Sequence, residues 1–351
     1  MGIGPGSPAA SPAGHAAHPA PSVRQLAGQR IVVGFPGTRP PAWLVRSIRR
    51  GDTGGVILMG ANVANRSALA RLTAQLQAIS RPASVDEPLL IMVDQEGGAV
   101  RRIAGPPVLS AARMGAGDPR VTRAAGRSAG RMLRSLGVTV DLAPVADVAG
   151  PESALAREGR TFGRQPRRVA RHAVAFAAGL RAAGVLATAK HFPGLGAARV
   201  NTDQAPVSIR RSAAVLRRVD AQPFAALIAH DVPLVMTSAA VYPALDPGRP
   251  ALLSAAVVRG ELRGRLGFAG TIITDALDTP ALAAVGDDRT VAVRAAQAGN
   301  DLLLYIDPVR GATAADALAV ALADGRLDRR AARVSFARVM ALRAGRPIVG
   351  G

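Results

Sequence analysis

The chain has 351 residues, 49% of them hydrophobic, so it can bury a full core as one large domain or two ordinary ones. This composition excludes a disordered or fibrous protein. Cysteine is absent, which excludes disulfides and thiolate metal sites, and no apolar run reaches the roughly 18 residues that a membrane span needs.

The formal net charge of +20, from 44 basic and 24 acidic residues, raises nucleic acid as a partner. The arginines are scattered over several predicted helices, however, and the chain holds only 7 Phe, 2 Tyr and 1 Trp, too few for a platform on which bases stack. We expect no nucleic-acid partner. The charge predicts a solvated arginine-rich surface or, as a second interpretation, attraction to acidic polymers such as carboxylate-bearing cell-wall glycans.

The first 22 residues are rich in Gly, Pro and Ala and lack the apolar core of a signal peptide. They predict a flexible leader over 1–22, followed by one domain over 23–347. The start as written predicts a cytoplasmic protein, whereas an export signal before it would make the protein secreted or place it in the cell envelope. His15 and His18 of this segment are not expected to bind metal.

From Val23 onward, short β-branched or aliphatic runs alternate with longer stretches of helical period, which is typical of βα units and a parallel sheet. The runs predict eight strands: 30–35, 55–59, 89–93, 138–142, 185–189, 232–237, 271–274 and 301–305. The stretches predict helices between them, including 66–79, 120–136, 167–183, 212–229, 254–266 and 290–298, and a final helical pair over 310–343.

Eight such units in about 325 residues predict an α/β fold, a (β/α)8 TIM-type barrel. The alternative is an open doubly wound sheet that binds a dinucleotide. That fold needs a glycine-rich turn opening a helix directly after the first strand, and residues 34–37 do not supply the pattern.

Polar residues gather where the predicted strands finish, which is where a barrel carries its chemistry. They are Asp94 and Glu96 after the third strand, Asp141 and Asp147 around the fourth, Lys190 and His191 after the fifth, Thr237 and Ser238 after the sixth, and Asp275 after the seventh. Lys190 is the only lysine among 44 basic residues. A compact ammonium at this place suits a polyhydroxylated or anionic ligand better than a planar guanidinium does.

Two carboxylates are presented most directly by their strands. Asp275 follows the run 271–274, so it is predicted as a nucleophile or a binding carboxylate; the alternative is a cap for a helix beginning near Thr279, a role for which Asp278 is the better candidate. Asp94 precedes glycines that let a ligand approach, so its carboxylate can accept two hydroxyls of one sugar, with a loop cap as the alternative. Glu96 is predicted to bind ligand or simply to pair with Arg101 or Arg102.

Five segments together resemble glycoside hydrolase family 3, and within it the single-domain β-N-acetylglucosaminidases (β-N-acetylhexosaminidases) that trim cell-wall muropeptides. These are residues 93–102, 142–148, 159–163, 187–194 and 273–277. The resemblance implies a barrel, Asp275 as the nucleophile that forms a glycosyl-enzyme, and no metal or organic cofactor. It also implies that Asp94, Arg160, Lys190 and His191 bind the N-acetyl sugar, in a protein that we expect to be a monomer.

One segment departs from that resemblance. The family's enzymes of this type continue Lys-His-Phe-Pro-Gly-His-Gly and then carry Asp-Ser-His on a loop, whose His is the general acid/base. Without gaps, Asn201 and Asp203 stand where that Asp and His would be, and residues 237–240 lack the His that the family commonly has there. His172 and His230 lie on predicted helices and are interpreted as partly buried structural residues.

Retaining hydrolysis needs a proton donor besides the nucleophile, so three outcomes stay open. Asp203 is the acid, in which case it needs burial, because an aspartic acid is ordinarily ionised at neutral pH and nearby Arg199 and Arg210 favour the charged form. Alternatively Glu158 or Glu96 supplies the proton. The third outcome is a glycan-binding pseudoenzyme that has lost most turnover.

Overall fold

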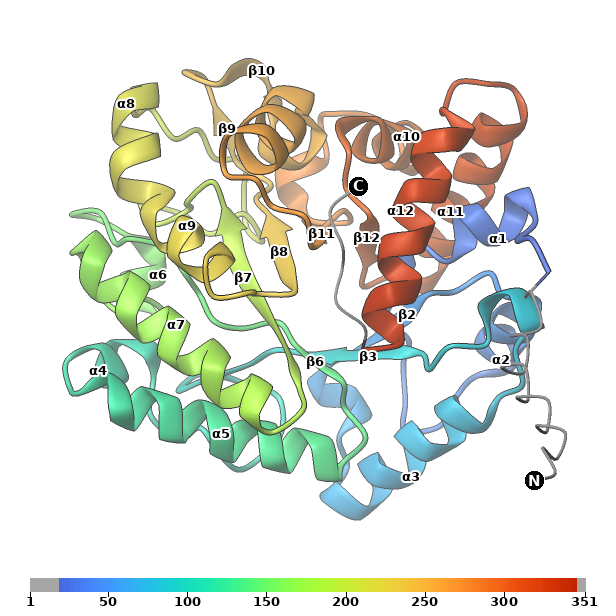
Figure 1. The fold of residues 1–351 in the computed structure, drawn as a ribbon, viewed down its shortest axis with the longest axis horizontal. Coiled ribbons are helices and arrows are strands. Elements are labelled where there is room, and N and C mark those ends of the chain that lie inside the picture. The colour runs from blue at the N-terminus through green and yellow to red at the C-terminus, as the bar shows by residue number, and fades with distance from the viewer. Residues whose placement is uncertain (1–18, 346–351) are drawn as a thin grey trace, which may run out of the picture.

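Eight parallel strands close into a barrel in the order β1, β12, β11, β8, β7, β6, β3, β2. The computed structural model describes residues 19–345, and helices surround the barrel (Figure 1). The strands are β1 Ile31–Val33, β2 Gly55–Leu58, β3 Leu90–Val93, β6 Val140–Asp141, β7 Leu186–Phe192, β8 Leu234–Thr237, β11 Thr271–Ala276 and β12 Leu302–Tyr305. The predicted (β/α)8 barrel is confirmed. Residues 1–18 of the expected leader and residues 346–347 of the expected domain lie outside the described residues.

The main helices follow the strands along the chain and form the outer layer (Figure 1). They are α2 Ala42–Arg50, α3 Arg66–Ala78, α5 Pro119–Ser135, α7 Pro166–Ala182, α9 Gln222–Ile228, α10 Asp288–Ala298, α11 Pro308–Ala323 and α12 Arg329–Arg343, preceded by the short α1 Val23–Gly28. The final pair predicted over 310–343 corresponds to α11 and α12.

Two predicted helices differ from the observed ones. The stretch 212–229 divides into α8 Ala213–Val215, a wide π turn over Leu216–Asp220 and α9. Pro223 stands in the first turn of α9, where it lacks the N–H that an uninterrupted helix would use, so a new helix begins there. The stretch 254–266 forms a wide π-helix, η5, over Ala256–Arg265.

Small elements complete the fold between the larger ones. Two hairpins pair β4 Gln95–Gly97 with β5 Val100–Arg101, and β9 Val241–Tyr242 with β10 Asp246–Pro250. Short helical turns are η1 Gly60–Asn62, η2 Ala83–Val85, α4 Ala111–Gly115, α6 Ala154–Arg157, η4 Ala251–Leu253 and η6 Pro280–Leu282. Within residues 19–345, no helix combines the length and apolar character that crossing a membrane requires.

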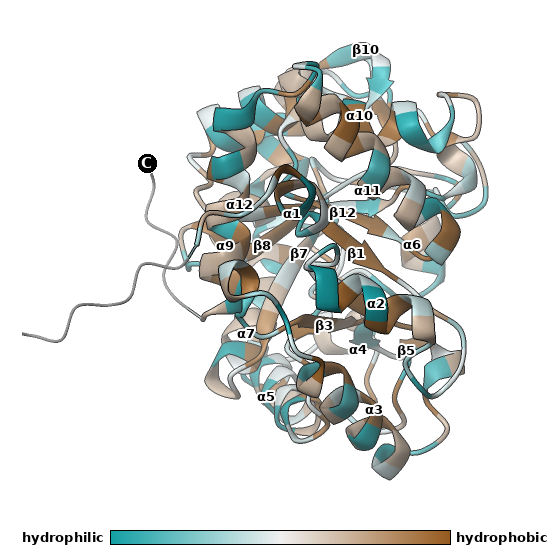
Figure 2. Ribbon diagram, turned by 90° about the vertical axis from the view of Figure 1, so that its right-hand side faces the viewer, coloured by the Kyte–Doolittle hydropathy of each residue, from teal (hydrophilic) through white to brown (hydrophobic). Residues whose placement is uncertain are grey.

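The core has two layers, because parallel strands covered by helices bury both faces. Side chains such as Ile57, Met92 and Ile273 fill the barrel interior, and the outward-facing residues pack beneath the helices. Figure 2 shows hydrophobic ribbon, in brown, along barrel strands such as β3 and β12. Val339 and Leu342 of α12 join the interior cluster. Arg343 of the same helix donates hydrogen bonds to the carbonyl of Pro88, just before β3. The C-terminal helix therefore closes the amino end of the barrel, which leaves the carboxyl end for ligands.

Candidate active site

Four charged side chains interlock at the carboxyl ends of β3 and β7. Lys190 Nζ lies 2.7 Å from Asp94 Oδ1 and 2.7 Å from Glu96 Oε1. Arg160 binds Glu96 through two parallel hydrogen bonds, Nε to Oε2 at 2.9 Å and Nη2 to Oε1 at 2.8 Å. Glu96 and Lys190 are almost fully buried, whereas Asp94 is partly exposed. The structure thus brings together three of the predicted sugar-binding residues, Asp94, Arg160 and Lys190.

The electrostatics of this network favour the charged forms of Glu96 and Lys190. Burial disfavours the charged form of Glu96, but the neighbouring Lys190 and Arg160 outweigh it and lower the pKa of Glu96 to about 2. Burial likewise opposes the charge of Lys190, and Asp94 and Glu96 more than restore it, so the pKa of Lys190 is raised. Glu96 holds no proton at neutral pH, which removes it as the acid. The expected pairing of Glu96 with Arg101 or Arg102 is wrong, since Arg102 lies 3.7 Å from Asp94 instead.

The β4–β5 hairpin delivers Glu96 to this position. Gly97 has φ +103°, and a Cβ there would lie 2.3 Å from the carbonyl oxygen of Leu109, so only glycine permits this approach. At the base of the hairpin, the buried carboxyl of Asp141 accepts the Gln95 N–H at 3.0 Å. Burial, with nearby Asp94 and Glu96, raises the pKa of Asp141 to about 8. Asp141 is therefore a buried group that supports the base of the hairpin carrying Glu96.

Strand β7 continues beyond its predicted end at residue 189 and carries Lys190 and His191 within it. Pairing persists because Ala146 N donates to Lys190 O at 2.7 Å on one side and Ser238 N donates to Phe192 O at 2.8 Å on the other. His191 is buried, and its Nδ1 lies 2.8 Å from Asp147 Oδ2.

Asp147 is a further candidate residue of the site, and its contact with His191 was not predicted from the sequence. Its carboxylate also accepts the backbone N–H of Leu195 at 2.6 Å, so it fixes the segment after β7 as well as the imidazole. A carboxylate at Nδ1 sets the tautomer and leaves Nε2 to face a ligand. The only signal was its place in the segment 142–148, where no pattern pairs it with a histidine 44 residues later.

Asp275 lies near the carboxyl end of β11, partly exposed, at the same end of the barrel as Lys190 and His191. Burial raises its pKa, as does the charge of Asp203, whereas His191 and Lys190 lower it. Its Oδ1 accepts the N–H of Ala276 at 2.9 Å. The capping alternative for Asp275 is wrong, because only the short turn η6 follows, with Thr279 before it. Asp278 is not a cap for that turn either: it accepts the N–H groups of Ile306 and Asp307.

Asp203 lies on an exposed segment beside Asp275. It lines a pocket of about 660 Å³ together with Ala276, Asp278 and residues that follow β1, β2 and β12. Thr279 Oγ1 donates to Thr202 O at 2.7 Å and ties the segment to the end of β11. The side chain of Asp203 is exposed, so the burial that an acid role requires is not present in the free protein. Arg199 pairs with Glu152 instead of approaching Asp203.

The remaining predicted residues serve structure. Thr237 Oγ1 donates to Asn300 Oδ1 at 2.8 Å, and Ser238 Oγ accepts the N–H of Ala240. His172 is buried against Thr122, as expected of a structural residue. The expectation for His230 is wrong, because it follows the end of α9 and is exposed. The side chain of Glu158, the other carboxylate considered as a proton donor, is 35% exposed, and its Oε2 lies 3.2 Å from Arg160 Nη1.

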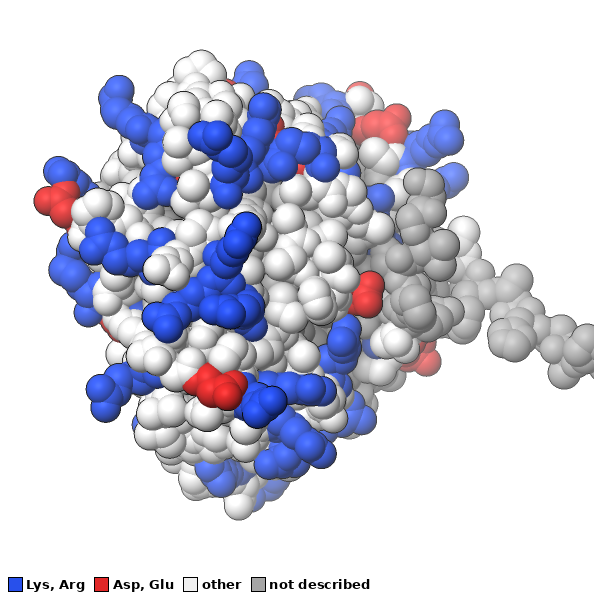
Figure 3. All heavy atoms as spheres, turned by 60° about the vertical axis from the view of Figure 1, so that its left-hand side comes forward, with Lys and Arg blue, Asp and Glu red and all other residues white. Residues whose placement is uncertain are grey.

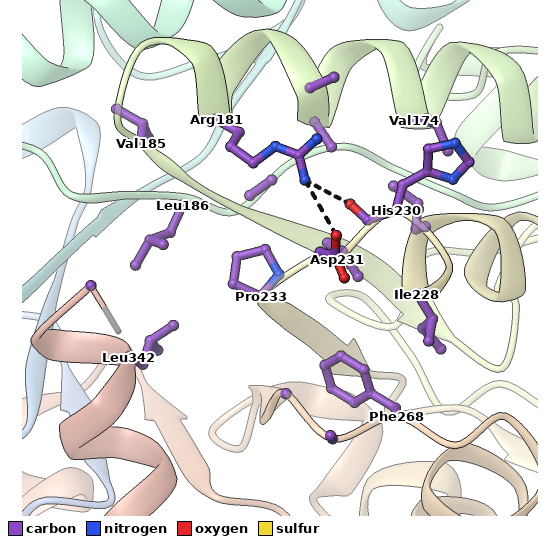
Figure 4. A pocket seen from close by; sticks show the side chains of 18 of the residues that line it. Val174, Arg181, Val185, Leu186, Ile228, His230, Asp231, Pro233, Phe268 and Leu342 are labelled. Atoms are coloured by element: carbon purple, nitrogen blue, oxygen red, sulfur yellow. Dashed lines mark hydrogen bonds and ion pairs between the residues drawn. The ribbon is translucent and has the colours of Figure 1, made fainter. Parts of the chain in front are cut away.

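A second pocket of about 740 Å³ lies at the opposite end of the barrel (Figure 4). Its walls come from α7, from the segments that precede β7, β8 and β11, and from Leu342 of α12. Arg181 reaches the carbonyl of His230 and the carboxylate of Asp231 across its edge. Because this is the amino end of the strands, the pocket does not belong to the site described above. Among residues 19–345, no group of three or more His, Cys, Asp or Glu side chains could hold a metal ion.

Comparison with known families assigns the whole barrel to one family. The family described as "Glycosyl hydrolase family 3 N terminal domain" matches residues 23–342. An "Uncharacterized secreted glycosyl hydrolase" of Arthroderma benhamiae is 38% identical over 327 residues, covering 91% of this chain and 92% of that protein. A "Beta-hexosaminidase" of Nitrosomonas eutropha is 34% identical over 265 residues, covering 73% of this chain and 74% of that protein.

Solved structures agree with this assignment. A glycoside hydrolase family 3 β-N-acetylglucosaminidase from Paenibacillus superposes with a TM-score of 0.87 at 34% identity; the match covers 93% of this chain and 63% of that longer protein. A β-N-acetylhexosaminidase from Beutenbergia cavernae has a TM-score of 0.83 at 35% identity, with coverage of 92% and 98%.

Proposed function

Because this chain belongs to glycoside hydrolase family 3 and is a β-N-acetylhexosaminidase-like glycoside hydrolase, we propose that it removes β-linked N-acetylglucosamine from cell-wall fragments by a retaining mechanism. The observation that carries the proposal is the placement of Asp275 near the carboxyl end of β11 and of Lys190 and His191 near the carboxyl end of β7, two strands that both pair with β8 in the barrel. The relatives' names supply the sugar, and the wall polymer as its source follows from the resemblance of the motifs.

In the proposed first step, Asp275 attacks the anomeric carbon of the bound sugar. The bond from that carbon to the leaving oxygen breaks, and the leaving oxygen takes a proton from Asp203, giving a glycosyl-enzyme and a free alcohol. Asp203 is suited by position, since it lines the same hollow as Ala276, next to the nucleophile. A bound sugar would supply the cover that Asp203 lacks in the free protein.

In the second step, water attacks the same carbon from the face that the leaving group vacated. Asp203, now ionised, takes the water's proton, and the ester bond to Asp275 breaks, so the product keeps the β configuration. The charged network holds the sugar throughout: the partly exposed Asp94 accepts hydroxyl hydrogen bonds, and Lys190 and Arg160 donate them. His191 donates its Nδ1–H to Asp147, so the Nε2 of the neutral ring accepts a hydrogen bond from a sugar hydroxyl. Lys190, Arg160 and His191 are each already fixed by a carboxylate partner, so little reorganisation is needed on binding.

The test is turnover of an aryl N-acetylglucosaminide and of a natural disaccharide by the wild type and two variants. Asp275→Asn should lose about 10³-fold or more of kcat/KM on both substrates, because the nucleophile is gone. Asp203→Ala should retain most activity on an aryl glycoside with a good leaving group and lose about 10²-fold on the disaccharide.

An experiment with azide tests the proposed acid/base role of Asp203 more directly. As a small anion, azide needs no general base, so with Asp203→Ala it should attack the glycosyl-enzyme, displace Asp275 and yield a β-glycosyl azide. Full activity of Asp275→Asn, or an Asp203→Ala variant equal to wild type on the disaccharide, would exclude the respective assignment.

A second candidate function is a glycan-binding pseudoenzyme. It is favoured by one observation: the acid position holds an exposed Asp203 in place of a His paired with Asp. In that case the protein binds N-acetylglucosamine saturably, measured by calorimetry, and releases no product from either substrate in prolonged incubation.

A further inference from the structure

One flank of the barrel carries concentrated positive charge. Helices α5 and α7 contain nine arginines and no acidic residue, and all nine side chains are exposed. We call this surface the arginine face; it consists of Arg120, Arg123, Arg127, Arg131 and Arg134 on α5, and Arg167, Arg168, Arg171 and Arg181 on α7. The two helices pack against each other along their lengths. Figure 3 brings the side of the barrel that holds them forward and shows many blue side chains with few red ones between them.

The arginines of α5 form a continuous stripe. They recur every three or four residues from Arg120 to Arg134, which places them on one side of a helix. A helix of 17 residues is roughly 25 Å long, so the stripe offers guanidinium groups at regular steps along a straight line. This arrangement matches an extended polymer with repeated negative charges better than a single small anion.

These arginines differ from many others in the protein, whose charge is neutralised by a neighbouring carboxylate. Arg217 and Arg265 share Glu261, and Arg263 pairs with Asp301. On the arginine face, across the part of the chain that the structure describes, only Arg181 has a carboxylate within ion-pair distance, Asp231 at 3.9 Å.

Two groups next to the arginine face bear on its charge. Asp118 is the acidic residue at the beginning of α5, and its carboxylate accepts the backbone N–H of Arg120 as a helix cap. Burial lowers the pKa of His172 beneath the face, and the charges of Arg168 and Arg171 lower it further.

The chemistry of the face narrows the class of partner. The rings of Phe176 and His172 on α7 are buried and α5 has no aromatic residue, so these helices offer no aromatic platform on which nucleic-acid bases could stack. Val121 is the large exposed apolar residue of α5, too little for insertion into a membrane. What remains is recognition of carboxylate or phosphate groups by guanidinium, which binds planar carboxylates through paired hydrogen bonds.

The face begins next to the candidate active site. Helix α7 starts three residues after Gly163, in the segment that also carries Arg160. Helix α4, which precedes α5, is joined to the same segment by a 3.0 Å hydrogen bond from Ala112 N to Gly159 O. Both helices therefore start at the rim that holds the sugar-binding network and run away from it down the flank.

We propose that the arginine face binds the carboxylate-bearing part of the cell-wall glycan while the chain end occupies the site. This inference rests on the proposed function, since it takes the same polymer as substrate and as docking partner. Contact along α5 would keep the enzyme on an insoluble polymer between cleavages. It would not alter the cleavage of a small substrate that is too short to reach the flank.

Co-sedimentation of the full chain with purified peptidoglycan, stripped of phosphate-containing polymers, tests the proposal. The variant Arg123→Glu/Arg127→Glu/Arg131→Glu should bind at least about tenfold less than wild type at low salt, and wild-type binding should fall steeply as salt is raised. The matched control Arg289→Glu/Arg330→Glu/Arg333→Glu changes the net charge equally at exposed positions elsewhere and should bind like wild type. Thermal unfolding and turnover of an aryl N-acetylglucosaminide should be the same for all three proteins.

Three results would overturn the proposal. Equal loss of binding in the control variant would show that net charge, and not this face, is responsible. Undiminished binding to peptidoglycan whose carboxyl groups are methyl-esterified would exclude carboxylate recognition. Binding to duplex DNA that depends on the same arginines, with none to peptidoglycan, would assign the face to nucleic acid. Wild-type binding without turnover would instead refute the proposed function and leave the docking surface standing.

Discussion

The two sides of the candidate site are built differently. On the β3 and β7 side, Lys190 and Glu96 are buried and lie 2.7 Å apart, and the partly buried Arg160 binds Glu96 through two hydrogen bonds. On the β11 side, Asp203 is exposed, and its segment is attached through backbone groups such as the Thr202 carbonyl. The hydrogen bonds of the first side fix its residues before any ligand binds. On the second side, a residue can be substituted without leaving a buried charge unpaired.

This difference explains where the sequence departs from the family resemblance. Replacing one member of the charged network strands its partners in a buried environment, at a cost of several kcal/mol. Replacing an exposed loop residue costs little stability. The position that aligns with the family's acid/base His can therefore hold Asp203, while the residues predicted to bind the sugar keep their identity.

The largest expected effect comes from breaking the rigid side. Lys190→Met leaves Asp94 and Glu96 close together without their shared cation, so it should destabilise the protein by about 3 to 5 kcal/mol. It should also reduce kcat/KM by about 10³-fold or more, because the sugar-binding geometry is lost. Urea unfolding and turnover of an aryl N-acetylglucosaminide measure the two effects.

The matched variant Lys190→Arg keeps the charge and separates the two roles of the ammonium. Stability should recover in part, but activity should not, because a planar guanidinium cannot occupy the position between Asp94 and Glu96. Wild-type activity of Lys190→Arg would mean that the single lysine of the chain has no special role.

A loss of kcat/KM of intermediate size is expected from a substitution of Asp147, the carboxylate partner of His191. Asp147→Asn removes the carboxylate that holds His191 Nδ1, so the imidazole can adopt the other tautomer or turn away from the sugar. The expected loss is about 10²-fold in kcat/KM with a small change in stability, since Asn still fills the space. The pH profile of kcat/KM distinguishes positioning from packing: a purely structural role would lower activity without changing the shape of the profile.

The sequence predicts some features of the molecule and not others. The eight strands and the rim residues were predictable because apolar runs are local signals and a barrel brings strand ends together. The partners within the site were not. Glu96 pairs with Arg160, 64 residues away, and not with the nearby Arg101 or Arg102, and His191 finds Asp147 on a neighbouring loop. Such pairings depend on the register of the strands, which no local pattern encodes.

The end of β7 was mispredicted for a related reason. Pro193 and Gly194 suggested that the strand had already ended, yet hydrogen bonds from both neighbouring segments continue it through Phe192. The exposed position of His230 was missed because the helix ends at Ile228, before the residue is reached. Tertiary contacts therefore decided the boundary of β7, whereas local hydrogen bonds such as His230 N to Leu227 O close the end of α9.

The smallest expected effect is a shift in the pH dependence of activity, caused by the charge of Asp203 acting on Asp275. Burial and the negative charge of Asp203 raise the pKa of Asp275, and His191 and Lys190 lower it. Asp275 must be ionised to attack, so activity falls when the pH drops through its raised pKa. Asp203→Asn removes one of the charges that raise this pKa, so the acidic limb of kcat/KM for an aryl glycoside should move to lower pH. Asp203→Glu keeps the charge and should leave the limb near that of wild type. A limb that moves to higher pH in Asp203→Asn would mean that the titrating group is not Asp275, or that the exposed loop lies too far from β11 for its charge to act there.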